Sequence, residues 1–422
     1  MSASARRSAG VRCVQLLTRH SASAGTISDR APVAQGEPPV PGLIGAEAMV
    51  SEEEFGSEDV ALAPAPRQAA RALHPFVFRH GRVGDMAMLT AVLRALHRRY
   101  GAPCYVIGMD PWIHDMYLGH PDVAACWHVP RKAPFALGLA WPAVVRALRR
   151  SAPAPVYVLE HHRREVPRIR RLLSLAGIDP RRCLYIEEEP GTESLWLDRL
   201  LEFAARTPPA LCAADYPPAA DARMWRPHLR VLESERRAAR KWLAAQGWRG
   251  EPVVLVQPGN HRTMGRRRMR QWLDRDDKTW PLAHWAELLR GIRAALPQAL
   301  IVLRGAPAET PMLEPIARAA GLPRVALAAC GLRRLFALCE LAQSMISVDT
   351  GPAHVGAALC VPLVVLYGIQ SPRVWLPRSG GCSPVLALKS QHVGQIAPQE
   401  VLEQWRTLPG ERGARDCAEQ QQ

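Results

Sequence analysis

Short apolar runs alternate along the chain with stretches in which apolar residues recur at helical spacing. The run 75–79 predicts a strand, and residues 86–100 predict a helix because apolar side chains return every three or four positions. Residues 104–108 form the next apolar run, and similar elements follow in the same order. This alternation is typical of a parallel sheet that helices cover on both faces.

A second series of such elements follows a proline-rich passage between residues 208 and 227. Helices that begin near proline or end near glycine support the assignment. The further strands predicted are 156–159, 253–256, 300–303, 345–348 and 363–367, and the further helices are 166–176, 233–246, 281–295, 311–320, 332–342 and 352–359. We therefore predict an α/β protein of two Rossmann-like, doubly wound domains facing a cleft, formed by residues 71–230 and 231–408.

The two ends of the chain lack this periodicity. Residues 1–70 mix Ser, Ala, Gly, Pro and an acidic run, which predicts a disordered extension, and residues 409–422 predict a disordered tail. The first residues are Ser- and Arg-rich, as in organellar transit peptides, but have no continuous apolar core like that of a secretory signal. The uncharged segment 350–372 contains prolines and a histidine, so it predicts a buried helix, a turn and a strand instead of a membrane span.

Charge and cysteine content narrow the classes of partner. Among 422 residues, 54 are Lys or Arg and 39 are Asp or Glu, a formal charge of +15 that favours an anionic partner. Nucleic acid, an anionic membrane face and phosphorylated substrates all qualify. A nucleic-acid-binding protein is disfavoured because aromatic residues do not interleave with the basic ones. The ten cysteines form no CxxC pair, so we expect no metal site.

The turn between the first predicted strand and helix, residues 81–86, contains Asp85. Such turns lie at the carboxyl edge of an open sheet, where ligands bind, and a carboxylate there can accept a proton. Capping of the following helix is the alternative role for Asp85. Arg82 lies in the same turn and is a candidate contact for an acceptor or another anionic partner. The turn lacks the GxGxxG spacing, which disfavours a nicotinamide oxidoreductase.

A second turn, after the predicted strand 345–348, combines four polar or special residues: Asp349, Thr350, Gly351 and His354. Backbone N–H groups at the start of the following helix make an anion site suited to a diphosphate. Asp349 and Thr350 can cap or position the loop, and His354 would lie one turn into the helix. A capped helix with a hydrogen-bonded histidine is the alternative.

Two further segments carry charged candidates at the same edge. Lys278 precedes a helix that starts with proline, where a compact positive charge can offset phosphate charge, although a solvated charge run is the ordinary interpretation. Glu309 follows the strand 300–303 and can accept hydrogen bonds from ribose hydroxyls or cap the next helix. Arg266, Arg267 and Arg268 belong to an arginine-rich loop that can contact an anionic acceptor or lipid headgroups.

In this order, the four segments resemble glycosyltransferase family 9, the ADP-heptose:lipopolysaccharide heptosyltransferases. Residues 83–88 are similar to the start of heptosyltransferase II, and residues 276–281 are similar to the donor-site lysine segment of the family. The resemblance covers residues 75–385, and its most specific part is Asp-Thr-Gly-x-x-His at residues 349–354. The chain departs from the family at Leu273 and Asp274 and in its arginine-rich loop.

The resemblance implies a GT-B fold with an N-terminal acceptor-binding domain and a C-terminal donor-binding domain. It implies an inverting, metal-independent transfer of heptose from ADP-L-glycero-β-D-manno-heptose to a lipopolysaccharide-core hydroxyl, without a cofactor. Asp85 would be the general base. Lys278 and the Thr350–Gly351 amides would hold the leaving diphosphate with His354 nearby. Asp349 would belong to the same donor-binding site, and Glu309 would bind the ribose.

The expected location is the cytoplasm, with peripheral contact to the anionic inner membrane. Another nucleotide sugar, used for O-antigen, capsule or protein glycosylation, is the nearest alternative. A second alternative is a protein that binds a sugar nucleotide but does not catalyse transfer.

Overall fold

The computed structural model describes residues 71–130, 140–161, 164–189, 193–264 and 278–410. All of them belong to one compact unit, Arg67–Gln422. The predicted N-terminal extension, the predicted tail and Arg266, Arg267 and Arg268 lie outside the described residues.

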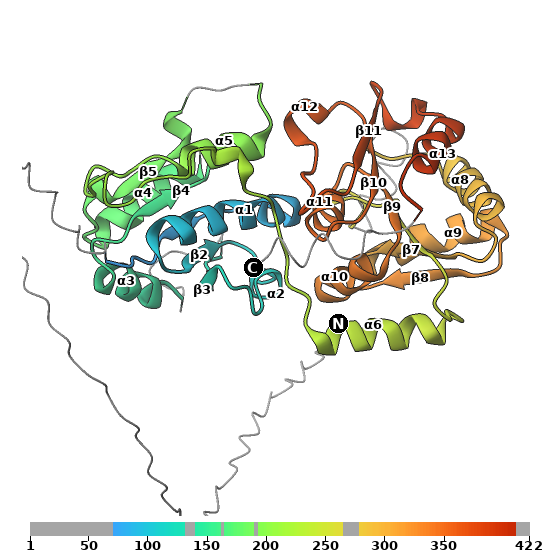
Figure 1. Ribbon diagram of the computed structural model, residues 1–422, viewed down its shortest axis with the longest axis horizontal. Coiled ribbons are helices and arrows are strands. Elements are labelled where there is room, and N and C mark those ends of the chain that lie inside the picture. Colours follow the sequence, from blue (N-terminus) through green and yellow to red (C-terminus); the bar gives the residue numbers. More distant parts are fainter. Residues whose placement is uncertain (1–70, 131–139, 162–163, 190–192, 265–277, 411–422) are drawn as a thin grey trace, which may run out of the picture. The chain divides into compact units, whose positions relative to one another are not determined.

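The first sheet has five parallel strands in the order β3-β2-β1-β4-β5 (Figure 1). Its strands are β1 (Phe76–Phe78), β2 (Cys104–Gly108), β3 (Val123–His128), β4 (Val156–Val158) and β5 (Cys183–Tyr185). The helices between and after them are α1 (Val83–Tyr100), α2 (Ile113–Met116), α3 (Ala140–Arg150), α4 (Glu165–Leu175) and α5 (Trp196–Ala204), with short 3-10 turns at Pro180–Arg182, Ile186–Glu188 and Ala222–Met224. β1 and β4 are short and wholly buried, as expected of central strands.

The second sheet has six parallel strands in the order β11-β10-β9-β6-β7-β8. Its strands are β6 (Val253–Gln257), β7 (Leu300–Gly305), β8 (Val325–Ala329), β9 (Ser344–Val348), β10 (Leu363–Tyr367) and β11 (Val385–Lys389). Its helices are α6 (Glu233–Ala245), α8 (Leu282–Ala295), α9 (Thr310–Ala320), α10 (Leu332–Leu341), α11 (Gly351–Ala358), α12 (Pro372–Trp375) and α13 (Pro398–Arg406), with 3-10 turns at Pro307–Glu309 and Val393–Gln395.

Alternate residues along the strands of the second sheet pack into two different hydrophobic cores. Val253 and Leu255 of β6 join the cluster that includes α6, α10 and α11, whereas Val254 and Val256 join the cluster that includes α8, α9 and α13. Successive side chains of a strand point to opposite faces, so a strand buried on both faces must be apolar throughout. The first of these clusters also contains the core of the first sheet. The apolar interior is therefore continuous from the first sheet to one face of the second.

The order of the strands indicates where each sheet can bind a ligand. In both sheets the order reverses beside the first strand, between β1 and β4 and between β6 and β9. Crossovers leave these two points in opposite directions, which opens a crevice at the carboxyl ends of the strands. The turns after β1 and β9, which contain Asp85 and Asp349, lie at these points.

The predicted α/β class with two Rossmann-like sheets is confirmed. The strands that the sequence did not predict are β3, β5, β8 and β11, which are the four sheet edges. Helix α1 starts at Val83, three residues before the predicted start, because Gly84 and Asp85 form its first turn. The helices α3, α5 and α13 were also missed, as were the short α2 and α12.

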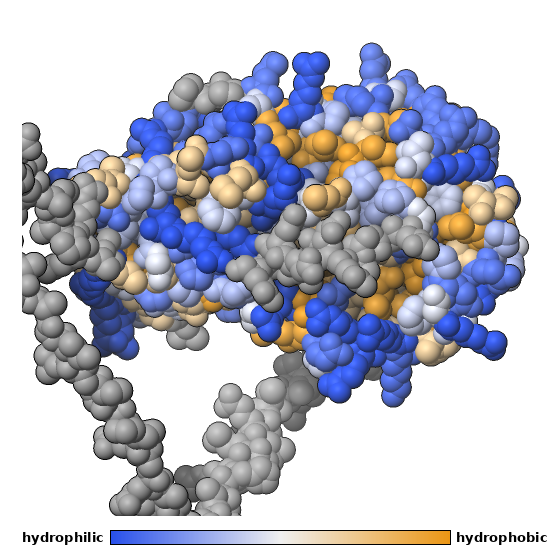
Figure 2. All heavy atoms as spheres, in the orientation of Figure 1, coloured by the Kyte–Doolittle hydropathy of each residue, from blue (hydrophilic) through white to orange (hydrophobic). Residues whose placement is uncertain are grey.

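The described surface is mixed. On the face drawn in Figure 2, hydrophilic residues predominate over the elements of the first sheet, and apolar atoms are visible among those of the second. None of the described helices has the length and apolarity needed to cross a membrane. The division into acceptor-binding and donor-binding domains at residue 230 stays a prediction.

Candidate active site

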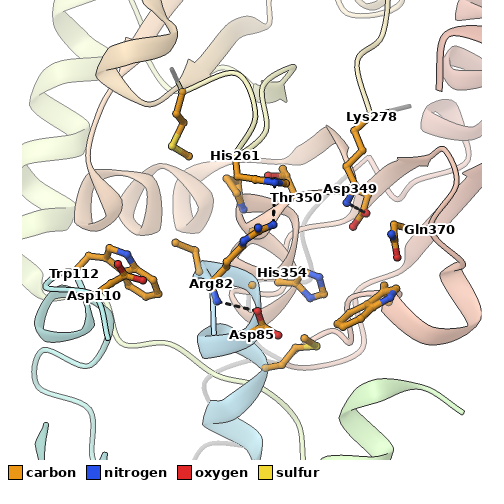
Figure 3. A pocket seen from close by; sticks show the side chains of 17 residues that line it. Arg82, Asp85, Asp110, Trp112, His261, Lys278, Asp349, Thr350, His354 and Gln370 are labelled. Atoms are coloured by element: carbon orange, nitrogen blue, oxygen red, sulfur yellow. Dashed lines mark hydrogen bonds and ion pairs between the residues drawn. The ribbon is translucent and has the colours of Figure 1, made fainter. Parts of the chain in front are cut away.

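A cavity of about 430 Å³ lies between the N-terminal ends of α1 and α11 (Figure 3). Every segment that lines it follows the carboxyl end of a strand or begins a helix. The lining residues predicted from the sequence are Arg82, Asp85, Lys278, Asp349, Thr350, Gly351 and His354. The structure thus brings together residues from both sheets that are far apart in the chain.

Asp85 lies in the first turn of α1 and accepts two hydrogen bonds. Its Oδ2 accepts from the backbone N–H of Arg82 at 2.9 Å, and its Oδ1 accepts from the guanidinium of Arg79 at 2.6 Å. Burial alone would raise the pKa of Asp85, but the charge of Arg79 and both hydrogen bonds outweigh it and leave the pKa below its ordinary value. Asp85 is therefore ionised at neutral pH, and it both caps α1 and faces the cavity.

Arg79 is a site residue that the sequence did not reveal. It is the residue directly after β1, only 3% exposed, and its other guanidinium nitrogen donates to the carbonyl of Leu159 at 2.7 Å. Because Leu159 directly follows β4, Arg79 bridges the two central strands of the first sheet and holds the Asp85 carboxylate. Its position at the end of an apolar run was the available signal, but a lone arginine there is not specific.

The opposite wall is the N-terminal end of α11. Thr350 is the N-cap residue, its side chain makes no capping bond, and the first turn contains no acidic residue. Lys278 reaches this end and forms an ion pair with Asp349, which is 7% exposed. The side chain of Lys278 is also mostly buried, and Asp349 holds its ammonium group at the rim of the cavity.

His354 lies between the two walls, between Asp85 and the Lys278–Asp349 pair (Figure 3). Burial lowers the pKa of His354 below its usual range, although the nearby Asp349 and Asp85 partly oppose this. Its Nδ1 is buried and has no hydrogen-bond partner. The ring is therefore neutral at pH 7, with a nitrogen available to a ligand.

Two glycines allow the walls to meet. A Cβ at Gly84 would lie 2.8 Å from Cδ2 of His354, and a Cβ at Gly351 would lie 2.9 Å from Cβ of Val83 and 3.0 Å from the backbone nitrogen of Gly84. Such distances are below ordinary van der Waals contact, so neither position has room for a side chain. The close packing of α1 on α11 sets the width of the cavity.

Arg82 also joins the two walls. Its Nη1 lies 3.0 Å from Nε2 of His261, in the loop after β6. His261 was not predicted from the sequence, and neither were the other lining residues Met88, Asp110, Trp112, Met264, Gln370 and Trp375. Most of them follow strands as single residues in loops, a pattern too common to identify a site.

Glu309 is placed differently from the other candidates. It is 1% exposed, its Oε2 accepts from the backbone N–H of Ala306 at 2.7 Å, and its Oε1 accepts from the hydroxyl of Thr263. Burial raises the pKa of Glu309, and the bonds from Thr263 and Ala306 only partly offset this. Glu309 does not line the cavity, and these contacts are those of the capping alternative. Its role at a ribose stays a prediction.

A second cavity, of about 480 Å³, adjoins the first on the side of the first sheet. The two share Arg82, Asp85, Asp110 and Trp375 in their linings. The second is lined further by Arg79, His80, Glu160 and His161, so its walls carry charges of both signs. Asp85 therefore stands where the two spaces meet.

Comparison with known proteins agrees with this geometry. Residues 228–403 match the sequence pattern of glycosyltransferase family 9 (heptosyltransferase). The chain therefore resembles glycosyltransferase family 9 over less than half of its length. The match covers the second sheet and its helices, including Lys278, Asp349, Thr350, Gly351 and His354.

Curated relatives match over a shorter stretch. A segment of 107 residues is 38% identical to lipopolysaccharide heptosyltransferase 1 of Escherichia coli (strain K12), and it makes up 23% of this chain and 30% of that relative. The corresponding protein of Salmonella typhimurium is 36% identical over 107 residues, which is again 30% of its length. The chain thus aligns with less than a third of the length of these family 9 relatives.

Solved structures are similar over most of the chain. E. coli ADP-heptose lps heptosyltransferase II superimposes with a TM-score of 0.60 at 21% identity, covering 79% of this chain and 98% of that one. E. coli heptosyltransferase WaaC with ADP gives a TM-score of 0.57 at 17% identity and covers 79% and 99%. A family 9 transferase from Veillonella parvula gives 0.63 at 16% identity and covers 81% and 98%. At these identities the likeness shows a shared fold.

Proposed function

We propose that this protein is an inverting glycosyltransferase that moves heptose from ADP-L-glycero-β-D-manno-heptose to a hydroxyl of the lipopolysaccharide core. The observation that carries the proposal is a single cavity in which the Asp85 carboxylate faces the Lys278–Asp349 pair and the N-terminal end of α11. The match of residues 228–403 to family 9 supports the reaction class. The heptosyltransferase names of its relatives support the donor sugar.

The α11 side suits the leaving diphosphate. A helix N-terminus offers backbone N–H groups and a partial positive charge, and here no acidic residue of the first turn competes for it. Lys278 lies beside it, and its ammonium group is held there by Asp349. As the glycosidic bond to the diphosphate breaks, the bonding electrons pass to the phosphate oxygen, and these groups stabilise the negative charge that results. In this proposal the backbone N–H groups of α11 and the Lys278 ammonium neutralise the charge of the diphosphate.

Asp85 suits the acceptor side. The acceptor hydroxyl oxygen attacks the anomeric carbon from the face opposite to the diphosphate, its proton passes to the Asp85 carboxylate, and ADP leaves. Attack from the opposite face inverts the anomeric configuration. The low pKa of Asp85 keeps it ionised but makes it a weak base in the resting state, so proton transfer must accompany formation of the new C–O bond. Arg79 holds the carboxylate in place as a positioning residue.

The remaining predicted contacts belong to the same proposal. Arg82 at the meeting of the two cavities would contact an anionic acceptor. Arg266, Arg267 and Arg268 would contact the acceptor or anionic lipid at the cytoplasmic face of the inner membrane, where exposed charges act most strongly at low salt. Glu309 would accept a ribose hydroxyl only if its contacts with Thr263 and Ala306 were rearranged.

The test is a transfer assay with the full chain. Purified protein is incubated with ADP-heptose, UDP-sugars or GDP-sugars and with a panel of truncated lipopolysaccharide cores, and products are identified by mass and by the anomeric configuration of the new linkage. We expect ADP release and an added heptose of inverted configuration with ADP-heptose alone. Transfer from a UDP- or GDP-sugar would reject the proposed donor. Retention of configuration would reject Asp85 as a base acting in a single displacement.

A further inference from the structure

His120, Asp122 and His228 lie together, and none of them lines the cavity described above. His120 and Asp122 lie between α2 and β3, whereas His228 lies on the linker that leads into α6. All three are buried, with 4%, 4% and 5% exposure, and the nitrogen and oxygen atoms they offer lie within 4.8 Å of one another. The cluster thus joins the linker to the first sheet.

Two atoms at the centre of the cluster are close but not hydrogen-bonded. The Oδ2 of Asp122 lies 2.8 Å from Nε2 of His228, yet neither atom has a hydrogen-bond partner by donor–acceptor geometry. Buried polar atoms without a partner are uncommon in native proteins because they lose their hydration without compensation. These atoms therefore call for an additional group that lies beside them and contacts both.

The third donor is Nδ1 of His120, 4.0 Å from Oδ2 of Asp122. The distances of 2.8 and 4.0 Å lie on either side of the separation of about 3.3 Å between ligand atoms that tetrahedral Zn²⁺ bonds of 2.0–2.1 Å imply. Nδ1 of His120 otherwise accepts only a long bond of 3.2 Å from the backbone N–H of Asp122. A metal ion could replace that bond.

The surroundings orient these donors as they do at metal sites. With its proton on Nε2, His120 donates to the backbone carbonyl of His228 at 3.2 Å, which leaves Nδ1 free to bind an ion. The other carboxylate oxygen of Asp122, Oδ1, is held by Nδ1 of His97 at 2.6 Å. The backbone N–H of His228 donates to the hydroxyl of Thr90 at 2.9 Å, which fixes the linker.

We propose that His120, Asp122 and His228 bind one Zn²⁺ ion, which fastens the linker before α6 to the first sheet. Two imidazoles and one carboxylate are a common donor set for zinc, with water as a fourth ligand. Arg94 is the competing feature, since its Nε lies 3.5 Å from Oδ2 of Asp122 and could neutralise the carboxylate instead. The sequence spacing could not reveal the site because His228 is distant from the other two in the chain.

The test measures metal in the full chain after expression in zinc-supplemented medium and removal of loosely bound metal. We expect about one Zn²⁺ per chain, and a melting temperature that falls by a few degrees with a chelator and returns with Zn²⁺. His228→Asn and Asp122→Asn should each lower the zinc content to below about a tenth and abolish the response of the melting temperature.

A matched control separates this site from binding elsewhere. His114 is exposed and its Nδ1 lies 3.2 Å from Sγ of Cys126, so this pair could take up zinc by itself. His114→Asn should keep the bound ion. If the cluster variants do not fold, Co²⁺ in the wild-type chain decides: visible bands of a nitrogen and oxygen site support the cluster, and a thiolate charge-transfer band rejects it. A folded wild-type chain without zinc, or zinc kept by His228→Asn, would also overturn the proposal.

Discussion

The N-terminal ends of α1 and α11 share their local structure but differ in electrostatics. Each follows a buried parallel strand at a switch point, and each carries a glycine that packs against the other helix. The first turn of α1 contains Asp85, which accepts from the backbone N–H of Arg82. The first turn of α11 contains no acidic residue, and Lys278 lies beside it.

This difference indicates which wall receives an anion. The positive end of α1 is already used by a carboxylate of the helix itself, so it offers little to a phosphate. The first turn of α11 has no such carboxylate, because the nearby Asp349 precedes the helix and is paired with Lys278. Two similar turns therefore support opposite tasks in the proposed reaction, proton removal at α1 and phosphate binding at α11. The predictions below test this division.

The largest expected effect is that of Asp85→Asn. Loss of the base should lower kcat by about 10² to 10⁴, while ADP affinity stays near that of the wild type because the phosphate groups are bound at α11. Stability should fall by about 1 kcal/mol for the lost cap, and further because Arg79 loses its partner. The measurements are kcat, ADP affinity and melting temperature.

Asp115→Asn is the control, because Asp115 lies in the first turn of α2 and does not line the cavity. It should leave kcat unchanged. A near-normal kcat for Asp85→Asn would remove Asp85 from the mechanism and leave it a capping residue.

Lys278→Ala should weaken phosphate binding at the α11 side of the cavity. A charge-assisted contact with phosphate contributes about 1.5–3 kcal/mol, so ADP affinity should fall by roughly 10- to 150-fold, with turnover reduced as well. Calorimetric titration with ADP measures the first effect. Lys241→Ala on α6 also removes one exposed positive charge, and it should change neither quantity. Unchanged ADP binding in Lys278→Ala would refute the assignment of the diphosphate to this wall.

Gly84→Ala tests whether the two walls must touch. The added methyl would meet the ring of His354 and push α1 away from α11, a type of overpacking that costs about 1–3 kcal/mol. We expect kcat/KM to fall by roughly tenfold with ADP affinity less affected. Gly331→Ala is the comparison, because a Cβ there would have no neighbour within 4 Å. Equal effects of the two substitutions would show that the contact is not needed for activity.

The smallest expected effect concerns pH. Asp85 has a lowered pKa and is already ionised at neutral pH, and His354 has a lowered pKa and is already neutral. As pH falls from about 8, Asp85 should stay ionised and His354 should gain its proton only below the ordinary histidine pKa of about 6.5, so kcat/KM should show no step at that pH. The measurement is a pH profile of the wild type and of His354→Gln. A step near pH 6.5 that His354→Gln removed would show that His354 titrates normally.

The class of fold and most of its central elements could be predicted from the sequence alone. All seven strands in the interior of the two sheets, β1, β2, β4, β6, β7, β9 and β10, were predicted, because burial on both faces requires a continuous apolar run. The edge strands β3 and β11 are only partly buried, so they carry no such run and were missed. The candidate residues Asp85 and Lys278 were visible because charged residues at turns next to buried strands stand out.

Which residues act together depends on the folded arrangement of the chain. Arg79 holds Asp85, Gly84 meets His354, and His228 joins Asp122 across long stretches of chain, since strand order and helix packing set these distances and local spacing does not. The same packing buried Glu309 against Thr263, away from the cavity that the sequence had suggested for it. The local sequence pattern indicates which side of each segment is buried. Polar contacts between distant segments depend instead on where the folded core places those segments.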